Sequence, residues 1–228
     1  MSTGAPLKLA VLISGRGSNM TAIVRACRSG AIAAEPFVVS DRADAAGIGS
    51  ARALGVDAEV LAPAADRERT LEQRLIATLE VRQAGLIALA GFMRILSAPF
   101  VARYLGRMLN IHPSLLPAYR GLHTHRRVLA AGDPEHGASV HFVTAELDSG
   151  PVVLQSKVKV EPDDTEAKLA ARVLATEHVI YPRALAWFAA RRLAWRDGAA
   201  WLDGRRLDQP IVEDFRAATA PASVPQPP

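Results

Sequence analysis

An amide and an imidazole stand two residues apart in the segment Asn110-Ile111-His112. The apolar run at residues 107–111 predicts a β-strand, so these residues fall where a strand ends. Side chains alternate along a strand, which points Asn110 and His112 to the same side of the sheet. Open α/β sheets bind their ligands at the carboxyl ends of their strands. The pair could therefore donate hydrogen bonds to one developing oxyanion.

A carboxylate, Asp148, lies in a turn between two predicted strands. Placed near His112, it would favour the imidazolium form of that side chain. No serine or cysteine has the context of a nucleophile, because Ser14 does not sit in a G-x-S-x-G pattern and Cys27 falls in a predicted helix. The three polar side chains indicate acid–base and oxyanion chemistry without a covalent intermediate.

A glycine turn, GRGSN at residues 15–19, follows directly on an apolar strand predicted over residues 7–14. Its glycines would let the backbone approach a ligand, and the amides at the start of the next helix would point at an anion. The turn lacks the third glycine of the dinucleotide fingerprint and the lysine of a P-loop. From the pattern alone, a phosphate site and a plain tight turn both stay open.

Asp41 ends a second predicted strand, where a dinucleotide-binding protein would hold a ribose hydroxyl. Without the third glycine we favour a structural role, as an ion pair within residues 40–42 or as a helix cap. Apolar residues around Met93 and Arg94 could line a flat pocket, or simply enter the core.

Four histidines, His123, His125, His136 and His141, occur close to this region. Histidine is the commonest metal ligand, but the H-x-H pair would face two sides of a helix start and no third ligand completes a set. We predict no metal and structural roles for most of these histidines.

Strands and helices alternate through the first half, which predicts a doubly wound, mostly parallel α/β sheet flanked by helices. After residue 111 we expect an antiparallel pair of strands, at residues 138–144 and 151–160. A long amphipathic helix should follow over residues 165–192, and a small hairpin over residues 193–207. Residues 1–210 would form one catalytic domain, with phosphate binding in its N-terminal half. Residues 211–228 are rich in Pro and Ala and predict a flexible tail.

Composition limits the class of protein. The 228 residues are 50% hydrophobic and 22% charged, enough for one sizeable core. The longest uncharged apolar stretch, residues 84–93, is about half of a membrane helix, and we expect neither membrane span nor signal peptide. The single cysteine fits the reducing cytoplasm. The net charge of +4 is spread along the chain, which favours a small anionic substrate over nucleic acid.

Several segments together resemble the phosphoribosylglycinamide formyltransferases, a branch of the formyltetrahydrofolate-dependent formyltransferases. They lie between residues 9 and 207 in the order typical of that family: VLISGRGSN, LAGFMRILS, NIHPSLLPAYRGLHTHRRVL, SVHFVTAELDSGPVVLQ, EHVIYP and WLDGRRL. NIHPSLLP followed by LDxGP is typical of the whole superfamily, whereas GxGSN, GLHTH and EHxIYP favour this branch.

The resemblance implies that the amine of glycinamide ribonucleotide attacks the formyl carbon of 10-formyltetrahydrofolate, with no metal. The catalytic residues would be Asn110, His112 and Asp148. The ribonucleotide would be held by Gly15, Gly17, Ser18, Asn19 and Glu177. The folate would be held by Arg67, Met93, Arg94, Ile95, Leu96, Asn110 and Val143, with Arg69 competing with Arg67 for its position. The family allows a monomer or a homodimer acting on small molecules.

Two other enzymes resemble the same core. Methionyl-tRNA formyltransferase would need a basic domain after Leu207 to hold tRNA, and formyltetrahydrofolate hydrolase would need a regulatory domain before Leu7. We therefore expect neither. A non-catalytic folate binder would lack one of the three polar residues named above, and all three are present.

Overall fold

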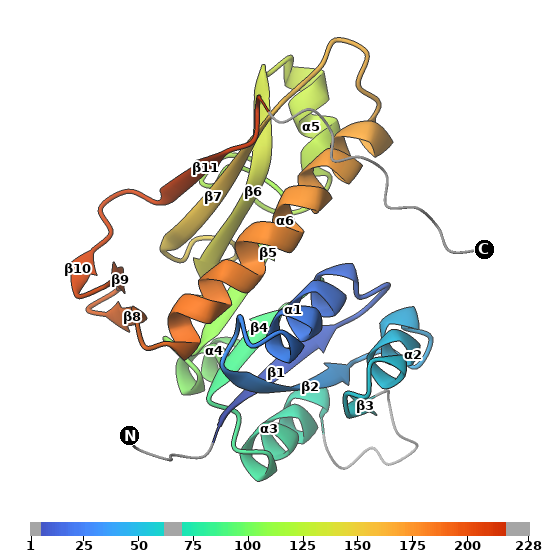
Figure 1. The fold of residues 1–228 in the computed structure, drawn as a ribbon, viewed down its shortest axis with the longest axis vertical. Helices are drawn as coiled ribbons and strands as arrows, with labels where there is room; N and C mark the ends of the chain where they lie inside the picture. The colour runs from blue at the N-terminus through green and yellow to red at the C-terminus, as the bar shows by residue number, and fades with distance from the viewer. Residues whose placement is uncertain (1–5, 62–69, 218–228) are drawn as a thin grey trace.

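The computed structural model describes residues 6–61 and 70–217. Its main sheet has eight strands in the order β11-β7-β6-β5-β4-β1-β2-β3 (Figure 1). Five neighbouring strands run parallel: β1 (Leu7–Ile13), β2 (Ala34–Ser40), β3 (Ala58–Val60), β4 (Leu86–Leu89) and β5 (Met108–His112). The predicted doubly wound, mostly parallel sheet is confirmed.

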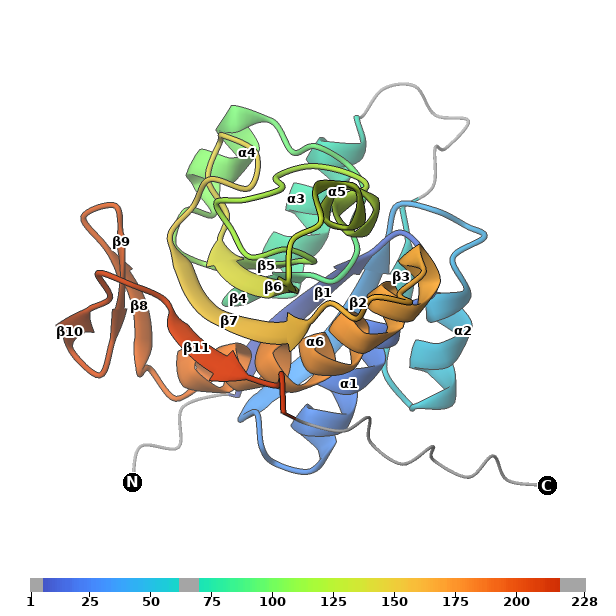
Figure 2. The ribbon, with the colours of Figure 1, turned by 90° about the horizontal axis from the view of Figure 1, so that it is seen from above.

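The predicted antiparallel pair continues this sheet beyond β5. Strand β6 (Glu135–Phe142) is antiparallel to both β5 and β7 (Val152–Lys159). Helices α1 and α6 lie on one side of the sheet, and α3 and α4 on the other (Figure 2). The helices are α1 (Ser18–Arg28), α2 (Ala46–Ala53), α3 (Leu71–Val81), α4 (Ala98–Arg103), α5 (Thr124–Ala131) and α6 (Glu166–Ala189).

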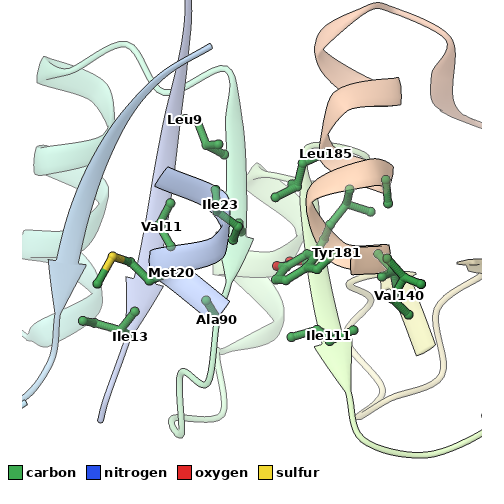
Figure 3. Packing of buried hydrophobic residues seen from close by; sticks show 14 of the residues in the cluster. Leu9, Val11, Ile13, Met20, Ile23, Ala90, Ile111, Val140, Tyr181 and Leu185 are labelled. Carbon is green, nitrogen blue, oxygen red and sulfur yellow. The ribbon is translucent and has the colours of Figure 1, made fainter. Parts of the chain in front are cut away.

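Strand β1 shows why both faces must be covered. Its residues 9, 11 and 13 belong to one buried cluster, which includes Met20 and Ile23 of α1 and Tyr181 of α6 (Figure 3). Its residues 10 and 12 belong to a second cluster, with Leu75 of α3 and Phe100 of α4. A strand buried on both faces has a continuous apolar sequence, and residues 9–13 of β1 show this pattern. None of the helices within the described ranges is long and apolar enough to cross a membrane.

The C-terminal region differs from the expectation in two ways. Residues 193–207 contain the predicted hairpin, formed by β8 (Leu193–Arg196) and β9 (Ala199–Leu202), and a third short strand, β10 (Arg205–Arg206), extends it. The flexible tail is expected from residue 211 onward, but Ile211–Asp214 forms β11, which pairs in parallel with β7. Ion pairs Arg183–Glu213 and Arg216–Glu135 fasten this strand to α6 and β6.

Candidate active site

A cavity of about 460 Å³ opens at the carboxyl ends of β4 and β5. Side chains from six separate segments line it, and they include Asn19, Asn110, His112, Asp148 and Glu177. The alternation along β5 places the amide and the imidazole at one cavity, as their spacing predicts. A larger groove of about 1670 Å³ lies at the opposite ends of the parallel strands, and it is lined by none of the predicted site residues.

His112 and Asp148 form the centre of the cavity. The imidazole Nδ1 lies 3.4 Å from Asp148 Oδ2, and each side chain is only 7% exposed. The other ring nitrogen, Nε2, lies 3.0 Å from the main-chain carbonyl of Tyr119. Each ring nitrogen of His112 therefore lies beside an oxygen atom that can accept a hydrogen bond.

Asp148 is held between two loops. Its backbone is left-handed, with φ 50°, and its Oδ2 accepts the Gly121 N–H at 2.9 Å. Its other oxygen lies 3.8 Å from Nε2 of His141. The carboxylate thus connects the loop that follows β5 with the loop that follows β6, and His112 lies where they meet.

His141 orients the Asn110 amide, a contact that the sequence pattern did not reveal. Burial lowers the pKa of His141 to about 4, although the Phe142 carbonyl and the Asp148 carboxylate act in the opposite direction. The neutral ring donates Nδ1–H to the Phe142 carbonyl at 2.9 Å, which leaves Nε2 as an acceptor. Asn110 Nδ2 lies 3.1 Å from that nitrogen. The second Nδ2 hydrogen stays available to a ligand.

The glycine turn presents open amides at the start of α1. Gly17 is the N-cap with φ 74°, no side chain caps the helix, and its first turn carries no acidic residue. The first amides of such a helix lack partners within the helix and attract anions. A Cβ on Gly17 would lie 2.9 Å from Gly47 Cα, and the Gly47 amide donates to the Gly15 carbonyl at 3.0 Å. Only glycine fits this contact, in which Gly47 supports the turn.

Asn19 and Glu177 join this turn to α6. Asn19 Nδ2 donates to Glu177 Oε2 at 2.7 Å, across 158 residues of sequence. Burial raises the pKa of the Glu177 carboxyl, and the Asn19 hydrogen bond opposes this shift. Among the described residues, Asn19 Oδ1 is buried without a hydrogen-bond partner. A buried acceptor of this kind calls for a donor from a ligand.

Residues 7–185 match the family described as formyl transferase. The chain belongs to the formyl transferase family. It is 51% identical over 203 residues to phosphoribosylglycinamide formyltransferase of Escherichia coli K12, covering 88% of this chain and 96% of that protein. The enzyme of that name from Haemophilus influenzae is 43% identical over 202 residues, covering 88% and 95%.

A solved structure agrees with these relatives. The phosphoribosylglycinamide formyltransferase of Coxiella burnetii superposes with a TM-score of 0.85 at 46% identity, covering 91% of this chain and 100% of that chain. The resemblance inferred from the motifs is therefore confirmed, and this formyl transferase family member is an enzyme.

The expected folate residues of this formyl transferase occupy different environments. Met93, Arg94 and Ile95 line the cavity. Leu96 is 9% exposed and belongs to the buried cluster around α4, against which Val143 also packs. Residues 62–69, including Arg67 and Arg69, lie outside the described residues.

Asp41 forms an ion pair, but its partner is not the neighbouring arginine. Its Oδ2 accepts Arg94 Nε–H at 2.8 Å, whereas Arg42 pairs with Asp44 at 2.6 Å. The structural interpretation therefore holds with a partner 53 residues away.

Two of the four histidines named from the sequence, His125 and His136, pair with each other beside the cavity. His125 Nδ1 lies 2.9 Å from His136 Nε2. Burial lowers the pKa of both rings, that of His136 to about 4. Within the described ranges no group of three or more His, Cys, Asp or Glu side chains could hold a metal ion.

Proposed function

We propose that this enzyme transfers the formyl group of 10-formyltetrahydrofolate to the amine of 5′-phosphoribosylglycinamide, a step of de novo purine biosynthesis. The products would be formylglycinamide ribonucleotide and tetrahydrofolate. One observation carries the proposal: the cavity lined by the Asn–His–Asp set is also lined by Asn19, which belongs to the uncapped glycine turn at the start of α1. Two relatives that this chain covers over nearly their full length are named phosphoribosylglycinamide formyltransferase. We propose a cytoplasmic enzyme acting as a monomer or homodimer.

The two substrates would approach from different sides. The ribonucleotide phosphate would bind the amides of residues 15–19, because these groups are open and uncapped. The ribose or glycinamide part would meet Asn19 and Glu177, which offer an unused acceptor and a carboxyl group. The folate would lie along residues 93–96, and Asn110, Val143 and Arg67 would also contact it.

Catalysis would proceed by direct attack. The amine nitrogen forms a bond to the formyl carbon, and the formyl oxygen becomes an oxyanion that accepts hydrogen bonds from Asn110 Nδ2 and from the His112 imidazolium. The oxyanion would take the Nε2 hydrogen bond that the Tyr119 carbonyl accepts in this structure.

Proton transfers complete the reaction. Asp148, with water, accepts a proton from the attacking amine, and it keeps His112 charged. As the bond from the formyl carbon to the folate nitrogen breaks, His112 helps to deliver the proton that this nitrogen takes up. A positioned acid–base group of this kind contributes about 10²–10⁴-fold to a rate.

The test is to mix the purified protein with 10-formyltetrahydrofolate and follow deformylation optically, with and without glycinamide ribonucleotide. Turnover only in the presence of the ribonucleotide supports the transferase. Formate release without it would indicate a hydrolase. Absence of turnover in both mixtures would contradict the proposal and favour a tRNA-directed enzyme or a folate binder.

A further inference from the structure

A buried carboxylate stands between the glycine turn and the cavity-lining loop of residues 91–96. Asp41, at the end of β2, has a side chain only 5% exposed. Neither the catalytic steps nor the substrate contacts proposed above use it. Both of its oxygens are occupied by donors of the protein itself, so it does not await a ribose hydroxyl.

The carboxylate reaches the loop by two routes. Asp41 Oδ1 accepts the Ser14 hydroxyl at 2.6 Å, and Asp41 Oδ2 accepts Arg94 Nε–H at 2.8 Å. Ser14 Oγ accepts in turn the main-chain N–H of Met93 at 2.9 Å. Hydrogen bonds to an ionised group are roughly twice as strong as neutral ones. The side chain of Asp41, directly after β2, therefore holds both the backbone and a side chain of a loop about 50 residues away.

Phe92 and Leu96 pack in or against the buried cluster around α4, but the middle of the loop has few apolar contacts to fix it. The side chains of Met93 and Ile95 are 66% and 81% exposed, so they do not anchor it in the core. A second hydrogen bond joins the Ser14 N–H to the Gly91 carbonyl at 3.1 Å. With its exposed tip and polar supports, the loop depends on the Ser14 and Asp41 contacts for its conformation.

The same carboxylate sets the direction of the Arg94 guanidinium. Arg94 uses Nε toward Asp41, and its side chain is 49% exposed and lines the cavity. A free arginine samples many rotamers, and binding a ligand would require ordering it. The Asp41 contact orders this side chain before a ligand arrives.

We propose that Asp41 is a positioning residue for the formyl donor. Through Ser14 and Arg94 it holds residues 91–96 in the conformation that receives the folate. This inference rests on the proposed function, because the loop is there assigned to the folate side.

The test compares Asp41→Asn with Asp44→Asn. The first variant keeps the shape of the side chain, but an amide offers one acceptor where the carboxylate offers two, so Ser14 or Arg94 loses its partner. We expect the KM for 10-formyltetrahydrofolate to rise about tenfold, while kcat and the KM for the ribonucleotide stay within about twofold. Asp44→Asn breaks the exposed pair with Arg42 on the same loop and should change neither KM.

Amide hydrogen exchange supplies a readout that does not need activity. Exchange over residues 91–96 should become faster in Asp41→Asn and in Ser14→Ala, which removes the acceptor of the Met93 N–H. Exchange over β1 and β4 should stay as in the wild type.

An unchanged donor KM in Asp41→Asn, or an equal rise in both KM values, would overturn the proposal. Unchanged exchange over residues 91–96 would overturn it as well. If the wild-type protein shows no turnover, the proposed function fails, and the exchange comparison still decides whether Asp41 holds the loop.

Discussion

The glycine turn of residues 15–19 and the surroundings of His112 both lie at the carboxyl ends of the parallel strands. The turn is formed by neighbouring residues, whereas the surroundings of His112 are formed by residues far apart in the sequence. The turn is one continuous segment, and the start of α1 presents its amides. His112 meets Asp148 from another loop, and Asp148 is held by the amide of Gly121, 27 residues before it. A composite site of this kind is lost when any one of its segments moves. Changes in the turn should therefore alter the affinity for one substrate, and changes around His112 should alter the chemical step.

The largest effect should come from His112→Ala. The variant loses a donor to the oxyanion and a proton carrier, so turnover should fall by roughly 100-fold or more. Steady-state rates measure the loss, and circular dichroism should show an intact fold. His125→Ala changes another histidine of the same cavity and should lower the rate only a few-fold. Turnover of His112→Ala within about tenfold of wild type would contradict its catalytic role.

Acid should weaken the fold through its buried histidines. Burial lowers the pKa of His141 and of His136 to about 4 in the folded chain, against about 6.5 when unfolded. The unfolded chain therefore binds more protons, and the free energy of unfolding should fall as the pH drops from about 6.5 to 4, by roughly 2–3 kcal/mol for each of the two histidines. Glu177, whose pKa burial raises, partly opposes this trend.

Urea unfolding at pH 7 and pH 5 measures this dependence. His136→Gln removes one of the two groups and should flatten it, whereas an identical pH slope in that variant would contradict the assignment. The glycine turn contains no histidine, so this acid sensitivity arises in the region around His112 and not in the turn.

A smaller and more selective effect is expected from Ser18→Asp. A negative charge at the start of α1 would repel the phosphate, and the KM for glycinamide ribonucleotide should rise about tenfold with the donor KM unchanged. Ser18→Ala keeps the amides without adding charge and serves as the matched control, with a change of about threefold at most. Equal weakening of both substrates by Ser18→Asp would indicate a damaged fold and contradict a local phosphate site.

The smallest effect should follow from Tyr119→Phe. The Tyr119 hydroxyl donates to Asp133 and helps to hold the loop whose carbonyl and amide face His112 and Asp148. Its loss should lower kcat about threefold, since one hydrogen bond contributes about 1 kcal/mol to stability and only part of that loss would reach the reacting groups. The control is Tyr104→Phe, because the buried Tyr104 hydroxyl has no hydrogen-bond partner within the described ranges and lies away from the cavity. An unchanged kcat in Tyr119→Phe would show that the loop does not need this anchor.

Local patterns predicted the elements that position the site. The apolar run before the glycine turn is β1, and the long helix expected over residues 165–192 is α6, Glu166–Ala189. The placement of Asn110 and His112 on one side also followed from a local rule, because side chains alternate along any strand. These features depend on periodicity and turn chemistry over a few neighbouring residues, which a sequence displays directly.

Tertiary packing alone decided which distant groups meet. Strand β11 has only four residues, and no local signal distinguishes it from a tail until β7 offers it a hydrogen-bonding edge. The pairs Asp41–Arg94 and Asn110–His141, and the hydrogen bond from Asn19 to Glu177, join segments between 31 and 158 residues apart. A buried polar side chain can form its hydrogen bond with any suitable group nearby, so the residue type alone does not predict which group that is. The folded sheet brings these paired residues together at the carboxyl ends of its parallel strands, and this arrangement determines the charges and the shape of the candidate active site.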